Sequence, residues 1–178
     1  MTITQQRIIT AFADVHLAGA RTLLECDFYD THYRYFDEVD DQYLTAVQHS
    51  AEDLLLKYGF DWPEHYMSLG LTALKNRARP DEKITFWTEV DHEYLYYFGG
   101  ECCFLDSEGF RFFLPAAMSR FLDAGEKNTT FIDHFINRLD LQWGKDAASF
   151  NDEQKAVIAE FVQQYFPKDV GWTFGYRI

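Results

Sequence analysis

The sequence lacks several patterns that would place it in a membrane or outside the cell. No apolar run approaches the roughly 20 residues that a membrane-spanning helix needs. The opening residues, MTITQQRIITAF, lack a basic region followed by an apolar core, so we expect no secretory signal. Cysteine is scarce. Cys26, Cys102 and Cys103 form an odd count with two adjacent, which predicts reduced thiols in the cytoplasm and no disulfide framework.

Motifs for catalysis and cofactor binding are also missing. The sequence has no G-x-S-x-G, no glycine-rich phosphate loop with its lysine, and no H-E-x-x-H. The Cys102–Cys103 pair has no second pair at zinc spacing. His49 and Asp53 fit one face of a helix and would begin a metal site, but no third ligand accompanies them in the sequence. We therefore expect no enzymatic activity, no cofactor and no metal.

Basic residues are few. Lys and Arg number 16 against 29 Asp and Glu, and the formal net charge is −13. Phosphate backbones and anionic lipid surfaces repel a protein of this charge. We therefore expect no direct binding to nucleic acid and none to membranes, and the natural partner of such a chain is a basic protein.

The acidic residues are concentrated between residues 25 and 64. That stretch has eleven acidic residues against Arg34 and Lys57, a balance of −9. Inside it, DFYDTHYRYFDEVDDQY mixes acids with aromatic side chains. Tyrosine offers a large apolar surface with a polar tip, and neighbouring carboxylates pair with Lys and Arg of a partner. The predicted partner-binding residues are Asp27, Asp30, Tyr33, Tyr35, Asp37, Glu38, Asp40 and Asp41.

The pattern of apolar residues and turn signals predicts an α+β fold, predominantly α-helical, as a single domain over residues 1–178. A capping box of Thr2 and Gln5 would begin the first helix. Further helices are expected within 50–60, 61–77, 129–139 and 149–166, by apolar spacing and by Gly59 and Pro167 at helix ends. Short runs rich in β-branched and aromatic residues predict strands. They are ITFWT (84–88), LYYF (95–98), CCFL (102–105) and GWTFGYRI (171–178).

The stretch FLDSEGFRFFLPAAMSRFL, residues 104–122, has apolar residues at helical spacing, which favours core over an aromatic ligand pocket. Asp106 or Ser107 is expected to cap it, and Gly125 lies where a helix would end. Because proline inside a helix costs about 3 kcal/mol, we expect two short helices joined at Leu114, with Pro115 in the first turn of the second. The residues predicted to be buried are Phe113, Leu114, Met118, Phe121 and Leu122.

The same stretch resembles the hallmark segment of a family of small bacterial proteins of unknown function. Members carry a phrase close to F-S-x-E-G-F-R-F-Y-L-P-A before a helix, and the matching block here is Glu108 to Ala116. IITAFADV resembles the way those proteins begin, and Trp62 takes the place of a tryptophan in one of their helices. The family has no activity to transfer, so the resemblance implies a fold and no function.

Together these features predict an acidic cytoplasmic binding protein. The first hypothesis is an immunity protein that neutralises a cationic nuclease-type toxin by occupying the groove where nucleic-acid phosphates would lie. The second is a housekeeping protein-interaction domain of the uncharacterised family. The third is an enzyme with a dispersed site, drawn from His32, His49, Asp53 and Cys102. An acidic surface that serves only solubility is the alternative to any binding role.

Overall fold

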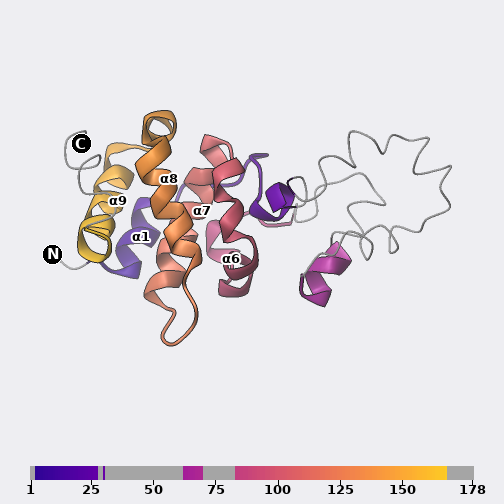
Figure 1. Ribbon diagram of the computed structural model, residues 1–178. Coiled ribbons are helices and arrows are strands. Elements are labelled where there is room, and N and C mark those ends of the chain that lie inside the picture. Colours follow the sequence, from indigo (N-terminus) through magenta and orange to yellow (C-terminus); the bar gives the residue numbers. More distant parts are fainter. Residues whose placement is uncertain (1–2, 28–29, 31–61, 70–82, 168–178) are drawn as a thin grey trace, which may run out of the picture. The chain divides into compact units, whose positions relative to one another are not determined.

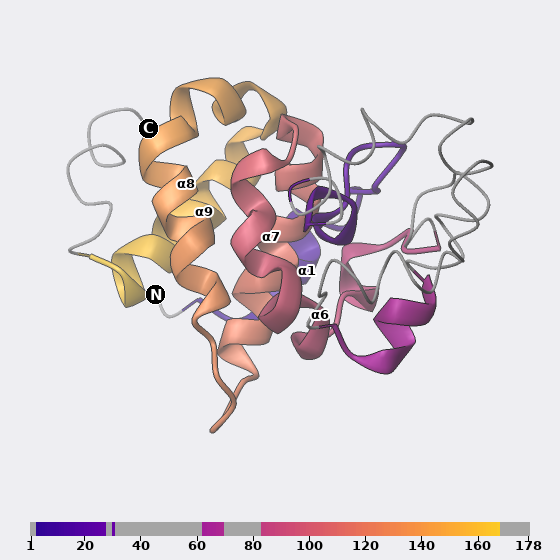
Figure 2. The ribbon, with the colours of Figure 1, turned by 45° about the vertical axis from the view of Figure 1, so that its right-hand side comes forward.

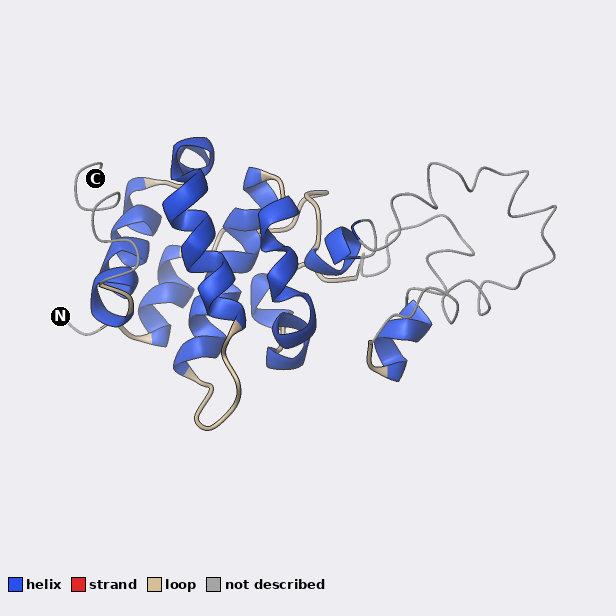
Figure 3. Ribbon diagram, in the orientation of Figure 1, coloured by secondary structure: helices blue, strands red, loops and turns tan. Residues whose placement is uncertain are grey.

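The computed structural model describes residues 3–27, 30, 62–69 and 83–167. In these ranges the elements are helices joined by loops (Figure 3). The chain divides into two compact units, one made of Met1–Leu23 with Ile84–Ile178 and the other of Leu24–Lys83. In the second unit, residues 24–27 and 64–69 are helical, and the latter helix begins directly after Pro63 as expected. The single domain over 1–178 stays a prediction.

The first unit is a bundle of short and medium helices (Figures 1 and 2). Helix α7 packs against α1 and α8, and α1 also packs against α9. The 3₁₀ segment η2 continues directly from α6 and packs against α8. The elements are α1 (Gln5–Ala11), η1 (Trp87–Glu89), α6 (His92–Phe98), η2 (Gly99–Phe104), α7 (Ser107–Leu122), α8 (Phe131–Asp146), η3 (Ala147–Ser149) and α9 (Asp152–Tyr165).

Helix α7 is the buried centre of this unit. All side chains from Phe112 to Ser119 are buried, as in a helix that is covered on every side. Three of the five predicted core residues are fully buried: Phe113, Leu114 and Met118. Phe121 and Leu122, near the end of the helix, are half-buried. The stretch is therefore core along most of its length.

The predicted break at Leu114 is wrong, because Ser107–Leu122 is one α-helix with Pro115 inside it. Proline lacks an N–H and its ring crowds the carbonyl four residues earlier, at a cost of about 3 kcal/mol. Burial of each large apolar side chain stabilises the fold by about 1.5–3 kcal/mol. The buried side chains around Pro115 therefore outweigh the cost of one lost helical hydrogen bond.

The strands predicted before α7 are also wrong. Residues 84–88 contribute an isolated bridge between Phe86 and His16, and then the 3₁₀ segment η1. LYYF lies inside α6, and CCFL falls in η2 and its C-terminal cap. GWTFGYRI lies outside the described residues. The fold class is therefore helical, not α+β, in the part of the chain that the structure describes.

The reason for this error lies at Asp91. Its side chain accepts a hydrogen bond from the Tyr94 backbone N–H at 2.7 Å and caps α6. The buried residues that follow, Tyr94, Leu95 and Phe98, recur at helical and not alternating spacing. A capping signal and helical spacing thus outweigh the β propensity of tyrosine and phenylalanine.

Capping residues define the ends of the other helices. Asp106 is the N-cap of α7, as predicted, and accepts from the Gly109 N–H at 2.7 Å. Thr4, and not Thr2, caps α1. Helix α7 ends before Gly125, which has φ +58° in the turn that leads to α8.

Candidate functional site

The predicted binding residues are described at two positions, Asp27 and Asp30. Asp27 is half-buried, and its Oδ2 accepts a hydrogen bond from Trp62 Nε1 at 2.7 Å, within the Leu24–Lys83 unit. The pKa of Asp27 is raised to about 6, mainly because burial disfavours the charged carboxylate. The hydrogen bond from Trp62 lowers this pKa, and the nearby charge of Asp30 raises it. Asp30 is exposed. Tyr33, Tyr35, Asp37, Glu38, Asp40 and Asp41 lie outside the described residues.

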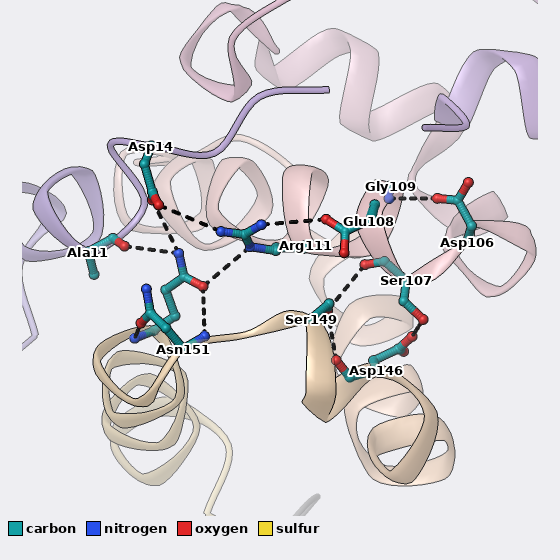
Figure 4. Close-up of polar contacts among 11 residues, drawn as sticks. Ala11, Asp14, Asp106, Ser107, Glu108, Gly109, Arg111, Asp146, Ser149 and Asn151 are labelled. Atoms are coloured by element: carbon teal, nitrogen blue, oxygen red, sulfur yellow. Dashed lines mark hydrogen bonds and ion pairs between the residues drawn. The ribbon is translucent and has the colours of Figure 1, made fainter. Parts of the chain in front are cut away.

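A polar network surrounds Arg111, one turn into α7 (Figure 4). Its guanidinium lies 3.4 Å from Glu108 Oε2, 3.8 Å from Asp14 Oδ2, and donates to Gln154 Oε1 at 3.4 Å. The Gln154 amide then donates to the Ala11 carbonyl at 3.2 Å. The network therefore joins the end of α1, the start of α7 and the start of α9.

A second polar centre is the buried ion pair of Arg138 and Asp146, both on α8. Both side chains are 1% exposed, and Arg138 Nε lies 2.8 Å from Asp146 Oδ2. Asp146 Oδ1 also accepts from the Ser107 hydroxyl at 2.8 Å (Figure 4). The pair thus connects α8 to the first residue of α7, and the carboxylate is fully hydrogen-bonded.

Arg138 also supports the turn between η2 and α7. Its guanidinium donates to the carbonyl of Cys102, and to those of Leu105 at 3.0 Å and Asp106 at 3.4 Å. It stacks over the Phe110 ring at 4.3 Å from the ring centroid. Because the charge is paired, stacked and hydrogen-bonded, it satisfies the conditions under which a buried charge is tolerated.

Gly109 completes the start of α7. A Cβ at this position would lie 2.6 Å from the carbonyl oxygen of Arg21 and 2.9 Å from Asp106 Oδ1. A larger residue would push the segment that contains Arg21 away from the helix. Each residue from Glu108 to Arg111 thus has a structural role. Glu108 forms an ion pair, Gly109 allows the close approach of the Arg21 carbonyl, Phe110 stacks on Arg138, and Arg111 forms the polar network.

The described residues offer no grouping typical of catalysis or metal binding. The Ser107 hydroxyl donates to a carboxylate, which does not activate it as a histidine would. Within the described ranges, no group of three His, Cys, Asp or Glu is arranged to hold a metal ion. His32, His49 and Asp53, the enzyme and metal candidates, lie outside those ranges.

The three cysteines are free thiols. Cys26 and Cys102 are buried, whereas Cys103 is exposed. The Cys103 Sγ lies 3.9 Å from the Gly100 carbonyl oxygen.

Sequence analysis missed a run of exposed aromatic residues on α6 and η2. Tyr96 is 49% exposed, Tyr97 39% and Phe104 48%, and these three residues are named here the aromatic face. The rings of Tyr96 and Tyr97 meet edge to face at 5.1 Å. Extending the helix from Asp91 through residue 104 would have placed these residues opposite the buried positions and revealed the face.

The buried pair of Arg138 and Asp146 was also missed. The two residues are eight apart on one helix, a spacing that places them on the same side about two turns apart. The pairing depends on Ser107 and on backbone carbonyls from η2, which no local pattern reveals.

Comparison with known proteins assigns the chain to a family. Residues 59–169 match the model of a family of unknown function (DUF6714), and the chain belongs to that family. The matched range contains the block from Glu108 to Ala116. No curated protein and no solved structure matches. Among the described residues, no helix is both long and apolar enough to cross a membrane.

Proposed function

We propose that this chain is a cytoplasmic binding protein that captures a basic protein partner through the acidic segment of residues 25–64. The observation that carries the proposal is the charge of that segment, eleven acidic residues against two basic ones. A field of this sign accelerates the encounter with a cationic partner and weakens as salt screens it, over about 8 Å at physiological ionic strength.

The partner that this chemistry fits best is a cationic nuclease-type toxin, and the chain would then be its immunity protein. A nuclease groove is lined with Lys and Arg for nucleic-acid phosphates, and carboxylates satisfy the same groups. Tyr33 and Tyr35 would supply apolar contact area, and tyrosine is among the residues that contribute most of the binding energy in interfaces. Inhibition by this route needs no chemistry from the chain itself.

The described helical unit pairs several of its charges within itself, and this supports the proposal. Arg138 is paired with Asp146, Arg111 with Glu108, and Arg7 with Glu160 at 2.9 Å. In each pair a base balances an acid. The acidic segment has no comparable supply of basic residues of its own, so its carboxylates suit cations from a partner.

The test is a triple charge reversal, Asp37→Lys with Asp40→Lys and Asp41→Lys, assayed for capture of a basic nuclease encoded beside the gene and for protection of the host cell. A matched control reverses three exposed acids of the helical unit: Glu126→Lys, Asp133→Lys and Glu153→Lys. Both variants change the net charge equally, so a difference between them reports the location of the charge.

We expect the segment variant to lose capture and protection while remaining folded by circular dichroism, and the control to retain both. Because truncating a desolvated carboxylate at an interface costs about 2–5 kcal/mol, the loss of affinity should be large. Equal binding by both variants and the parent protein, at low and at high salt, would show that the segment is only a solvated surface.

A further inference from the structure

Helix α6 and segment η2 form one continuous helical run over residues 92–104, with one side fixed in the core. Its inward residues are at most 2% exposed: Tyr94, Leu95, Phe98 and Cys102. A Cβ added at Gly99 would lie 2.6 Å from the Cβ of Phe131, so the run lies tightly on α8. The carbonyl of Cys102 is held by Arg138. Residues 92–104 are therefore held against the core, and the residues on their outward side have fixed positions.

That outward side is aromatic. The three residues of the aromatic face are between 39% and 49% exposed, and helical spacing places Tyr96 and Tyr97 opposite the buried residues. A large part of each of these side chains therefore lies outside the core. Anchored aromatic side chains lose little further freedom on contact, and such residues are enriched where binding energy is concentrated.

The stretch of sequence that contains the aromatic face is acidic, and the basic side chains that reach it, Arg120 and Arg138, come from α7 and α8. Between Lys83 and Arg111 the chain has no Lys and no Arg. It has six acidic residues there: Glu89, Asp91, Glu93, Glu101, Asp106 and Glu108. Residues 84–110 thus carry −6 and residues 25–64 carry −9, so in a chain of −13 all other residues together carry +2. The two stretches therefore account for the whole net negative charge of the protein.

Three of these carboxylates accept hydrogen bonds from backbone N–H groups. Glu89 accepts from the backbone N–H groups of Thr85 at 2.9 Å and Phe86 at 3.0 Å. These bonds lower the pKa of Glu89. Asp91 and Asp106 cap α6 and α7. These hydrogen bonds hold the three carboxylates in defined positions in the helical unit.

We propose that the aromatic face, with the carboxylates around it, is a docking surface for a Lys- and Arg-rich segment of a partner protein. Guanidinium and ammonium groups are attracted to the faces of tyrosine and phenylalanine rings, and the surrounding carboxylates complement their charge. The choice of a basic partner rests on the proposed function. The surface itself consists of residues of the helical unit, which lie outside the acidic segment in the sequence.

The test uses the full chain and two synthetic peptides, one in which Lys and Arg alternate with Gly, and one in which Glu replaces the basic residues. Backbone amide spectra follow each titration. The face variant combines Tyr96→Ser, Tyr97→Ser and Phe104→Ser. The control is Leu141→Ser, because Leu141 on α8 is 81% exposed and is a large apolar residue outside the aromatic face. Circular dichroism checks the folding of both.

We expect the basic peptide, but not the acidic one, to shift the amide signals of residues 92–104. The face variant should bind the basic peptide at least about tenfold more weakly, and Leu141→Ser should change affinity by less than about twofold. If the face variant does not fold, Tyr96→Ser alone provides the same comparison. The triple reversal at Asp37, Asp40 and Asp41 should leave the shifts of residues 92–104 in place, which separates this surface from the acidic segment.

Three results would overturn the proposal. The first is a set of shifts confined to the acidic segment or spread evenly over the chain. The second is equal affinity of the face variant and the Leu141→Ser control. The third is a change of the signals of residues 92–104 with the concentration of the protein itself, because the occupant would then be a second copy of the chain.

Discussion

Replacing Asp146 by alanine would leave the guanidinium of Arg138 charged inside the protein. Both side chains are 1% exposed, and Arg138 Nε lies 2.8 Å from Asp146 Oδ2. Removing one partner of a buried ion pair costs about 3–5 kcal/mol, because the remaining charge is neither hydrated nor paired. The Ser107 hydroxyl also loses its acceptor at 2.8 Å, which adds about 1 kcal/mol. We therefore expect Asp146→Ala to lower the free energy of unfolding by about 4–6 kcal/mol.

A double variant separates the charge from the hydrogen bonds. With Arg138→Met added to Asp146→Ala, no unpaired charge remains, but the carbonyls of Cys102 and Leu105 lose their donor. Each hydrogen bond that a buried carbonyl loses costs about 1–3 kcal/mol. The double variant should therefore be more stable than Asp146→Ala alone and less stable than the parent protein.

Guanidinium chloride unfolding followed by far-ultraviolet circular dichroism measures these differences. The matched control is Arg7→Ala, which breaks the pair of Arg7 and Glu160, with side chains 40% and 20% exposed. An exposed pair is worth at most about 1 kcal/mol. A destabilisation by Asp146→Ala no greater than that of Arg7→Ala would refute the reasoning.

Three further predictions concern other positions. Gly109→Ala should destabilise the helical unit by about 1–3 kcal/mol, since its Cβ would lie 2.6 Å from a backbone carbonyl oxygen; an unchanged unfolding midpoint contradicts this. A thiol reagent should label exposed Cys103 in the native protein and spare buried Cys102, as peptide mass spectrometry would show, and equal labelling contradicts this. The raised pKa of Asp27, about 6, means that its contribution to stability is fully present below about pH 4 and is lost as the pH rises through 6. The Asp27→Asn variant should lack this pH dependence and should still accept the hydrogen bond from Trp62, so at pH 7 its free energy of unfolding should exceed that of the parent by up to about 3 kcal/mol. Unfolding experiments from pH 4 to 8 measure this difference, and parallel pH profiles of the two proteins contradict it.

Helix α9, and α8 as far as residue 139, could be predicted from the sequence because their signals are local and agree with one another. In α9, Asn151 and Gln154 form a capping box and buried residues recur every three to four positions. In α8, Phe131, Phe135 and Leu139 repeat at four-residue spacing. Where the cap, the periodicity and the C-terminal signal coincide, tertiary contacts only confirm what the segment already favours.

The errors arose where local preferences conflict with burial. LYYF has strong β propensity, but Asp91 and the buried side of the run favour a helix. Pro115 disfavours a helix interior, but the core around α7 keeps the helix intact. The acidic segment could be found from the sequence, but the buried network of Arg138 could not. Charge is visible in composition, whereas the network of Arg138 depends on carbonyls more than 30 residues away in the chain.

The distribution of charge has one more consequence. Crowding like charges into a compact protein raises its free energy through repulsion, and residues 25–64 and 84–110 contain only two basic residues, Arg34 and Lys57, against seventeen acidic ones. Solubility alone requires only a net charge away from zero, spread over the surface. In this chain the two stretches carry a net charge of −15 and all other residues together carry +2. The repulsion within the two stretches is therefore greater than solubility requires. A cationic partner that contacts either stretch would relieve the repulsion within it on binding, and so part of the binding free energy would come from repulsion already present in the free protein.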